Sequence, residues 1–385
     1  MLTPIFILKN LSRHRLRNAL TIVGIAMSVL SFGLLRTTVD AWFAGVEASS
    51  ATRLVTRNAV SLILPLPISY AERIRGVEGV TRVCAGSWFG GEYIDEKNFF
   101  PNYAVDARSY FDLYPELVLP PEQKEAFLRD RKGCVIGRQL AQRFGWRLGD
   151  PLTLKGTAYP GDWGFTVRGI YKGRDKSVDE TLLVFHWDYL DETLKKEGSK
   201  QVGQAGFFIL CIADAKRAPA ISRAVDARFV NSMAETLTET EKAFQMSFVT
   251  MSEAIVAAIQ MVSSLVILII MAVAANTMAM SARERMSEFA ALKAMGFGGG
   301  YLALLILGES FTIAGIGCLL GCGLTFPAAS AFGEAVSQYF PVFQVSRTTV
   351  LLQGLCALGV GLVAGVVPAL RARSVSIAEA LRRAG

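Results

Sequence analysis

The sequence predicts an α-helical membrane protein with four transmembrane helices, plus an α+β extracytoplasmic domain carried on helical stalks. Two observations lead to this fold class. Apolar residues gather in stretches long enough to cross a bilayer, and basic residues gather in the short segments that flank those stretches. Of the 385 residues, 52% are hydrophobic and 19% are charged, and that charged share is below the roughly 25% of soluble domains.

Four stretches approach the roughly 20 apolar residues that cross about 30 Å of hydrocarbon. They lie at 19–39, 254–280, 302–332 and 350–370. The first has the basic start of a cleaved signal peptide. Its apolar core is longer than that of a signal, and residues 37–46 offer no convincing cleavage motif. We therefore expect an uncleaved first transmembrane helix.

Basic residues set the expected orientation. Residues 1–18, 282–300 and 371–385 together hold 11 Lys/Arg and three acids, whereas 333–349 holds one Arg. Because positive charge favours the cytoplasmic side, both termini and 282–300 are expected in the cytoplasm, and 333–349 outside. The insert 44–250 carries 27 Lys/Arg against 26 Asp/Glu, so the formal net charge of +7 indicates no nucleic-acid partner.

The expected division of the chain follows from these spans. It comprises an amphipathic interfacial helix (1–18), the first transmembrane helix (19–43), an extracytoplasmic α+β domain of two lobes (44–231), a stalk continuing into the second transmembrane helix (232–281), a cytoplasmic helical loop (282–300), the third transmembrane helix (301–332), a short periplasmic loop (333–349), the fourth transmembrane helix (350–370) and a cytoplasmic tail (371–385). Lys9, Arg13 and Arg17 share one face of the first helix, which favours contact with anionic lipid.

The extracytoplasmic insert alternates short strand and helix patterns. Strands are expected at 80–85, 91–94, 102–106, 134–137, 151–154, 165–171, 181–185 and 207–213, and helices at 138–144, 187–194 and 218–230. Ser69 and Glu72 have capping-box spacing, which predicts a further helix start. Residues 115–132 are expected to connect the two lobes. The pairing of Cys84, Cys134 and Cys211 stays open, because an odd number of cysteines cannot all pair.

A heptad pattern predicts the stalk. Leu237, Phe244, Met251 and Ala258 recur every seven residues, and Phe248, Ile255 and Val262 form a second series offset by four. Alternating steps of four and three define a coiled-coil seam. We expect one continuous helix over about 232–281, with Phe244, Phe248, Met251 and Ile255 packed against residues 37–55. The alternative is an ordinary amphipathic helix of the domain, separate from the membrane helix.

Catalytic chemistry is not expected in this chain. His14 and His186 are its two histidines, which argues against a His-dependent triad or a zinc cluster. The sequence contains no G-x-x-x-x-G-K-[ST] phosphate loop. Residues 298–300 are three glycines that predict a turn after a helix stop at Gly296. If the protein uses ATP, another chain hydrolyses it.

The loop after the second transmembrane helix carries the most specific motif. Residues 276–296 read NTMAMSARERMSEFAALKAMG and resemble the signature of the MacB/LolC/FtsX-type permeases, the mechanotransmitting class of ABC transporters. Residues 365–382 are similar to that family's G-x-x-P-A-x-R-A-x-x-x-x-P-x-E-A-L-R ending, with Ile377 where Pro is usual. In the insert, residues 135–141 and 147–152 resemble its V-I-G-x-x-L-A and L-G-D-x-I segments. The resemblance covers essentially the whole chain.

The resemblance implies that residues 282–295 form a coupling helix that docks on a dimeric cytoplasmic ABC ATPase. The residues expected to contact the ATPase are Arg283, Glu284, Arg285, Glu288, Phe289, Leu292, Lys293 and Gly296. Phe289 and Leu292 are expected to be the apolar anchors in the partner's groove. ATP and Mg would then bind to the partner and no cofactor to this chain. A second permease copy or a paralogue and the bacterial inner membrane are further implications.

The resemblance further implies that the permease transmits ATP-driven motion to the outer domain, for efflux of a periplasmic or membrane-derived substrate. A periplasmic adaptor and an outer-membrane channel would be its partners. One alternative is extraction of lipid or lipoprotein from the outer leaflet, and another is a non-transporting scaffold that activates cell-wall hydrolases. Glu309, about two turns into the third transmembrane helix, is an intramembrane acid and therefore a candidate functional residue. An interhelical hydrogen bond is the structural alternative.

Overall fold

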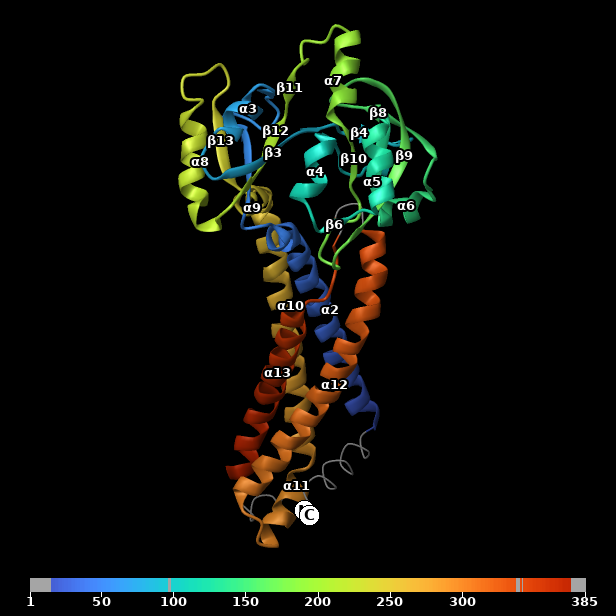
Figure 1. Cartoon of the computed structure of the whole chain (residues 1–385). Helices are drawn as coiled ribbons and strands as arrows, with labels where there is room; N and C mark the ends of the chain where they lie inside the picture. Colours follow the sequence, from blue (N-terminus) through green and yellow to red (C-terminus); the bar gives the residue numbers. More distant parts are fainter. Residues whose placement is uncertain (1–14, 96–97, 337–339, 341, 375–385) are drawn as a thin grey trace. The chain divides into compact units, whose positions relative to one another are not determined.

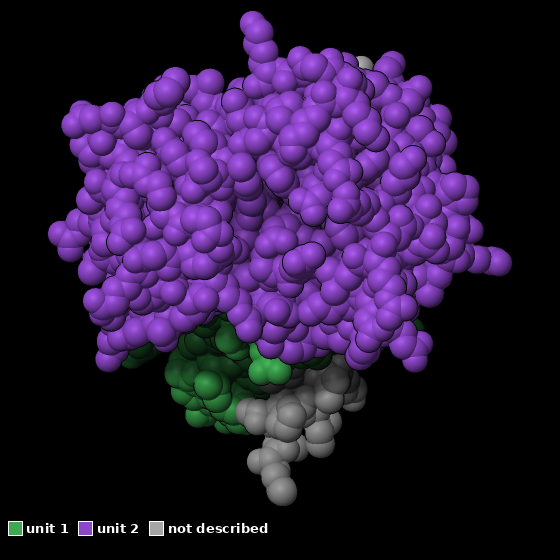
Figure 2. All heavy atoms as spheres, turned by 45° about the horizontal axis from the view of Figure 1, so that its top comes forward, with its two compact units in different colours: residues 1–41, 252–335, 343–385 green, residues 42–251, 336–342 purple. Residues whose placement is uncertain are grey.

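A computed structural model describes residues 15–95, 98–336, 340 and 342–374. The predicted helix 1–18 and the tail 371–385 therefore lie largely outside the described residues. The chain forms two compact units, which Figure 2 distinguishes by colour. We call Met1–Ala41, Ser252–Ala335 and Phe343–Gly385 the helical unit. Trp42–Met251 and Val336–Val342 form the sheet unit.

Four long helices dominate the helical unit (Figure 1). They are α2 (Arg15–Ala48, whose last turns belong to the sheet unit), α10 (Glu253–Glu284), α12 (Gly299–Ala335) and α13 (Arg347–Ser374). Each is long and apolar enough to cross a membrane. The prediction of four transmembrane helices is confirmed.

Close backbone approach holds α12 against its neighbours. A Cβ atom on Gly321 would lie 2.7 Å from the Ala26 carbonyl oxygen of α2, and one on Gly365 of α13 would lie 2.8 Å from Ser310 Oγ of α12. Small residues at such contacts allow helices to pack closely in lipid. A polar contact joins the same three helices, because the buried Gln353 Nε2 donates to the Val29 carbonyl and to Thr325 Oγ1, each at 2.9 Å.

The sheet unit is built on one large mixed sheet. Its strands are β1 (Arg53–Asn58), β3 (Val80–Trp88), β4 (Gly91–Glu92), β5 (Asn102–Val105), β6 (Leu117–Val118), β7 (Gly133–Gly137), β8 (Pro151–Gly156), β9 (Gly161–Gly173), β10 (Leu183–His186), β12 (Phe207–Ile212) and β13 (Thr236–Thr240). The order is β13-β1-β12-β3-β5-β10-β7-β9-β8-β4, with β6 beside β9. Most pairs are antiparallel, whereas β10 runs parallel to β5 and β7 parallel to β9. A separate pair joins β2 (Leu66–Pro67) to β11 (Gln204–Ala205).

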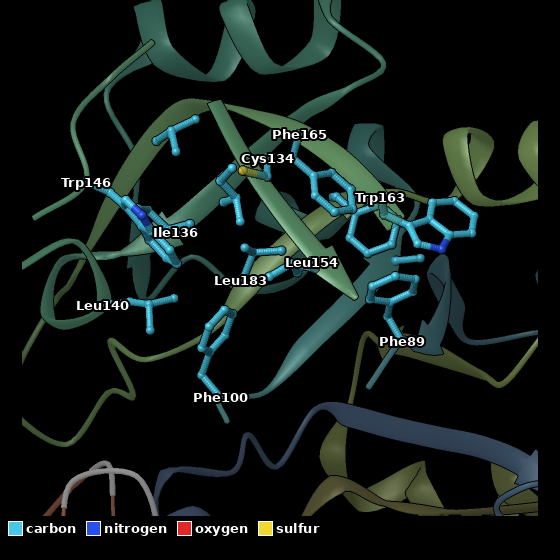
Figure 3. Packing of buried hydrophobic residues seen from close by; sticks show 14 of the residues in the cluster. Phe89, Phe100, Cys134, Ile136, Leu140, Trp146, Leu154, Trp163, Phe165 and Leu183 are labelled. Carbon is cyan, nitrogen blue, oxygen red and sulfur yellow. The ribbon is translucent and has the colours of Figure 1, made fainter. Parts of the chain in front are cut away.

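Helices cover both ends of this sheet (Figure 1). They are α3 (Tyr70–Arg75), α4 (Ala107–Leu113), α5 (Pro121–Arg129), α6 (Arg138–Phe144), α7 (Trp187–Lys196), α8 (Ala218–Ala227), α9 (Glu241–Met251) and the short 3-10 helix η2 (Ala215–Arg217). One buried cluster lies between α3, α8 and β12, and a second, rich in aromatic rings, lies among α6, α7 and β7–β10 (Figure 3). We call these two regions lobes; a third buried cluster, which joins residues of β3 and β12 to residues of β7 and β9, lies on the same sheet.

Three expectations for the sheet unit were wrong in detail. Residues 115–132 are no simple connection, since they form β6 and α5, and Phe127 is fully buried. Ser69 precedes α3 but makes no side-chain capping bond. The predicted strand 91–94 stops at Glu92, because Ile94 takes a left-handed conformation with φ of 66°.

The predicted continuous helix over 232–281 is also wrong. Residues Thr236–Thr240 form the edge strand β13, and the helix begins only at Glu241. It is then interrupted at Ser252, whose φ of −103° and ψ of 11° separate α9 from α10. Alternation in 236–240, with buried Thr236 and Thr238 between more exposed neighbours, is the period-2 signal that the heptad reading missed.

Replacing Gly321 by Ala tests the close helix contact. The new Cβ would meet the Ala26 carbonyl oxygen at 2.7 Å, and overpacking of this kind costs about 1–3 kcal/mol. Gly323→Ala is the matched control, since nothing lies within 4 Å of its Cβ. Thermal unfolding of the detergent-solubilised protein should show a lower midpoint for Gly321→Ala only. Equal midpoints for the two variants would contradict the close contact.

Candidate functional site

A short helix, α11 (Met286–Ala294), lies between α10 and α12. Arg285 separates α10 from α11 with φ of −102° and ψ of 13°. The helix ends at Gly296, whose φ of 93° suits a residue without Cβ. The Gly296 N–H donates to the Lys293 carbonyl and the Phe297 N–H to the Leu292 carbonyl, which is the Schellman pattern. The predicted helix stop at Gly296 is confirmed.

Phe289 does not occupy the position that the sequence predicted. Only 1% of its surface is exposed, so it cannot be an anchor in a partner's groove. Its ring packs among Ala282, Leu302, Ile306, Ala369 and Ala372, which come from α10, α12 and α13. Leu292 packs against the same cluster. These two side chains therefore hold α11 to its own chain.

A buried ion pair joins the start of α11 to α12. Arg285 Nη1 lies 2.7 Å from Glu309 Oε2, and only 13% and 10% of the two side chains are exposed. Arg285 Nε also lies 3.1 Å from Glu288 Oε2, and its guanidinium is 5.2 Å from the Phe289 ring centre. Glu309, singled out as an intramembrane acid, thus has its counter-ion in the loop segment. An isolated carboxylate would be costly at this depth, whereas a paired one is tolerated.

Further contacts fix both ends of α11. Lys293 Nζ donates to the Arg373 carbonyl of α13 at 2.9 Å. On α10, Glu284 pairs with Arg17 of α2, whose Nη2 also donates to Ser281 Oγ at 3.0 Å. The short helix itself therefore contacts α10, α12 and α13, and the end of α10 that precedes it is bound to α2. A displacement of α11 must be shared by α10, α12 and α13.

The exposed face of α11 carries small side chains. Ser287, Ala291 and Ala294 are exposed at helical spacing. Just beyond the helix, Met295 is 68% exposed and Phe297 is also exposed. Arg283 is exposed too, whereas Arg285 and Phe289 are turned inward. Met295 and Phe297 were not predicted as exposed apolar residues, although their positions on either side of the helix stop at Gly296 were a signal for them.

The seam residues are largely uncovered within this chain. Met251 is 82% exposed, and Phe248 and Ile255 are exposed as well, while Phe244 packs edge-on against Phe248 with ring centres 5.1 Å apart. The prediction that the seam is buried against residues 37–55 is therefore wrong for Phe248, Met251 and Ile255. The same alternation of three and four continues along α10. Its next members, all exposed, are Ala258, Val262, Leu265, Ile269, Ala272 and Asn276.

The histidine and the cysteines of the sheet unit have structural surroundings. His186 Nε2 lies 2.7 Å from the Phe127 carbonyl oxygen, and burial lowers the pKa of this imidazole. Cys84 and Cys134 are buried free thiols, and burial raises the pKa of Cys84 to about 12. Neither thiol is a reactive thiolate at neutral pH.

Known proteins share this arrangement of segments. Residues 19–228 match the family of MacB-like periplasmic core domains, and residues 260–377, which include α11, match the FtsX-like permease C-terminal family. An uncharacterized ABC transporter permease of Methanocaldococcus jannaschii is 24% identical over 417 residues, covering 98% of this chain and 96% of the relative. An uncharacterized ABC transporter permease protein of Mycobacterium tuberculosis is 24% identical over 262 residues, covering 66% of this chain and 29% of that protein.

Two solved structures resemble part of the chain. One is the extracellular domain of YknZ, a noncanonic ABC-type transporter from Gram-positive bacteria, with 12% identity and a TM-score of 0.34 over 49% of this chain and 100% of that one. The other is a domain of a permease protein from Porphyromonas gingivalis, with 12% identity and a TM-score of 0.35 over 50% of this chain and 92% of that one.

Removing Glu309 tests the ion pair. Glu309→Leu should destabilise the helical unit by about 3–5 kcal/mol, because it leaves the buried Arg285 without its closest carboxylate. The double variant Arg285→Leu/Glu309→Leu should recover most of that loss. Glu288→Leu is the matched control, since it removes the more exposed partner of the same guanidinium and should cost about 1 kcal/mol or less.

Thermal unfolding and limited proteolysis between residues 283 and 297 would measure these effects. A Glu309→Leu variant as stable and as protease-resistant as Glu288→Leu would show that the pair does not hold α11.

Proposed function

This chain is an ABC transporter permease of the family with a MacB-like periplasmic core domain and an FtsX-like permease C-terminal region, and we propose that it converts motion of a separate ATPase into work by its sheet unit. The work is export of a periplasmic or membrane-derived substrate. One observation carries the proposal: the α11 segment is bound to α10, α12 and α13 by the packing of Phe289, by the Arg285–Glu309 ion pair and by the Lys293 hydrogen bond, and the adjoining end of α10 is paired with α2. A force applied to α11 is therefore passed to the helices that lead to the sheet unit.

The orientation that this function requires agrees with the charges. The short segments rich in Lys and Arg, including α11, would face the cytoplasm of a bacterial inner membrane. The sheet unit would then lie on the opposite side, where its nearly balanced charge suits a soluble domain. ATP and Mg would be bound by the cytoplasmic partner. A periplasmic adaptor and an outer-membrane channel are the partners that efflux would add.

The proposed ATPase-binding surface is the exposed face of α11 together with the residues after it. The short side chains of Ser287, Ala291 and Ala294 would let the groove of a partner approach the helix closely. Met295 and Phe297 supply the exposed apolar anchors that Phe289 cannot supply. Arg283 and Glu284 lie at the rim, where charges mainly adjust orientation and association rate.

Replacing Ala291 by Trp tests this surface. The bulky ring should block docking while Phe289 keeps α11 in place, so co-purification of the ATPase and its stimulation should both fall. Truncation of an anchor, Phe297→Ala, should weaken association by about 1–2 kcal/mol or more. Lys200→Trp, at an exposed site of the sheet unit, is the control for an added indole.

Pull-down from mild detergent and ATP hydrolysis would be measured in parallel. If no ATPase associates with the unsubstituted chain, or if Ala291→Trp binds it as well as Lys200→Trp does, the coupling proposal fails. ATP-dependent activation of a cell-wall hydrolase without transport would favour the scaffold function instead.

We further propose that α10 pairs with the same helix of a second permease copy. Along α10, Ile255, Val262, Ile269 and Asn276 occupy the a positions of the seam, and Ala258, Leu265 and Ala272 occupy the d positions. β-Branched residues at a favour two-stranded pairing, and one Asn at a fixes register. All of these residues are exposed within a single chain. A second copy would cover them, including the amide of Asn276 that lipid would leave unpaired.

Cysteine cross-linking tests the pairing. Ala258→Cys and Ala272→Cys lie at d positions, where paired helices bring Cα atoms within the roughly 4.4–6.8 Å that a disulfide spans. Mild oxidation in membranes should give a covalent dimer for both. Ala257→Cys, equally exposed but off the seam, and the unsubstituted chain, with its own cysteines, should give much less. Equal dimer from positions 257 and 258 would exclude this seam, and a cross-link to a different protein would identify a paralogue.

A further inference from the structure

A buried ionic cluster lies where the chain passes into and out of the sheet unit. After α2 ends at Ala48, β1 begins at Arg53, and β13 ends at Thr240 immediately before Glu241 begins α9. Strands β1 and β13 are paired, with Leu54 opposite Thr240, so the two connections to the flanking helices are neighbours. Arg53 and Glu241 are 5% and 6% exposed.

Arg53 is bound in three directions. Its Nε lies 2.8 Å from Glu241 Oε2, its Nη2 lies 2.6 Å from Glu116 Oε1, and its Nη1 donates to the Leu113 carbonyl at 3.1 Å. The guanidinium lies over the Tyr114 ring, 4.2 Å from its centre. The carboxylates raise the pKa of Arg53 despite its burial. Most donors of the rigid guanidinium fork therefore have partners.

Glu241 closes the cluster from the other connection. Its Oε2 also accepts from the Ser50 backbone N–H at 2.8 Å, and its Oε1 accepts from Tyr114 Oη at 3.2 Å. Ser50 follows α2, and Glu241 is the first residue of α9. One carboxylate thus ties the end of the first flanking helix to the start of the second.

The cluster also contacts the lobe that is rich in aromatic rings. Leu113 ends α4, Tyr114 and Glu116 lie between α4 and β6, and β6 pairs with β9. The Glu116 carbonyl also accepts from the Arg174 N–H at 2.9 Å, directly after β9. Strand β9 in turn pairs with β7 and β8, so Arg53 connects both flanking helices to the central strands of the aromatic lobe.

Stability alone does not account for such a cluster. Buried ion pairs are often replaceable by apolar side chains with no loss of stability, because desolvation offsets the Coulomb gain. What an apolar contact lacks is the fixed geometry of a fork held by two carboxylates and a carbonyl. A displacement of α2 or α9 is imposed on Arg53 through Glu241, and on the 113–116 turn through Glu116.

We propose that Arg53, Glu116 and Glu241 are positioning residues that transmit movement of α2 and α9 to the lobe built on β7, β8 and β9. This inference rests on the proposed function, because the movement originates at the ATPase. Glu116 supplies the ionic part of the link to the lobe, beside the Leu113 carbonyl and the Tyr114 hydroxyl, whereas the Arg53–Glu241 pair holds the two connections together.

Glu116→Leu is the sharpest variant. It removes the ionic part of the link to the lobe and leaves Arg53 paired with Glu241, so one cation still faces one carboxylate and the chain should still fold. Glu239→Leu is the matched control. It removes an ion pair across the same two strands, Arg57 Nε to Glu239 Oε1 at 3.0 Å, that leads to no other lobe. Arg53→Lys, which keeps the charge but loses the fork, should give a partial effect.

The measurement is hydrogen exchange of the full-length permease with its ATPase in nanodiscs, with and without ATP and Mg. In the unsubstituted complex and in Glu239→Leu, ATP should change the protection of both α9 and β9. In Glu116→Leu the change in α9 should persist and the change in β9 should be clearly smaller, with ATP hydrolysis unaltered and a lower thermal midpoint, because a buried cation loses one of its two carboxylates.

Two outcomes would overturn the inference. One is an ATP-dependent change in β9 that is undiminished in Glu116→Leu, and the other is an unsubstituted complex in which α9 responds and β9 does not. Absence of any response in α9, or of any bound ATPase, would instead contradict the proposed function on which the inference rests. If Glu116→Leu unfolds, Arg53→Lys with an unchanged midpoint and an undiminished β9 response would equally overturn it.

Discussion

The helical unit depends on how closely α12 approaches its neighbours. Lipid offers little hydrophobic drive for helix association, so contact area and hydrogen bonds must supply it. Gly321 brings the backbone of α12 against α2, and Gly365 brings α13 against Ser310. That approach places the Gln353 amide within reach of both α2 and α12. It also leaves α12 buried enough for an acid at position 309 to require a counter-ion.

Arg285 meets that requirement and in doing so fixes the start of α11 against α12. The residue lies at the break between two helices, and its side chain returns to α12 instead of projecting outward. Phe289 follows it into the same interior. The charged and aromatic residues of the motif therefore hold the helix in place, while small residues form its outer face. A helix that is firmly held by its own chain and has small side chains on its exposed face suits the contact with a partner that we propose.

Much of this could be predicted from sequence because the governing signals are local. The length of the apolar stretches predicted the four long helices, and Gly296 predicted the end of α11. The 236–240 strand was missed because its pairing with β1 is a non-local contact that a heptad pattern conceals. Phe289 was misassigned because sequence alone cannot tell a residue buried in its own chain from one that awaits a partner. The Arg53 cluster joins residues 188 positions apart and has no local signature.

The pairing of β1 with β13 has a consequence for how such a protein could arise. Since the first and one of the last elements of the sheet unit lie side by side, the unit begins and ends at nearly one place. A fold with adjacent ends can be inserted between two consecutive helices without forcing them apart, and exchanged for another with the same property. The helices and the inserted unit can then diverge separately in evolution, so that one set of helices can carry different inserted units.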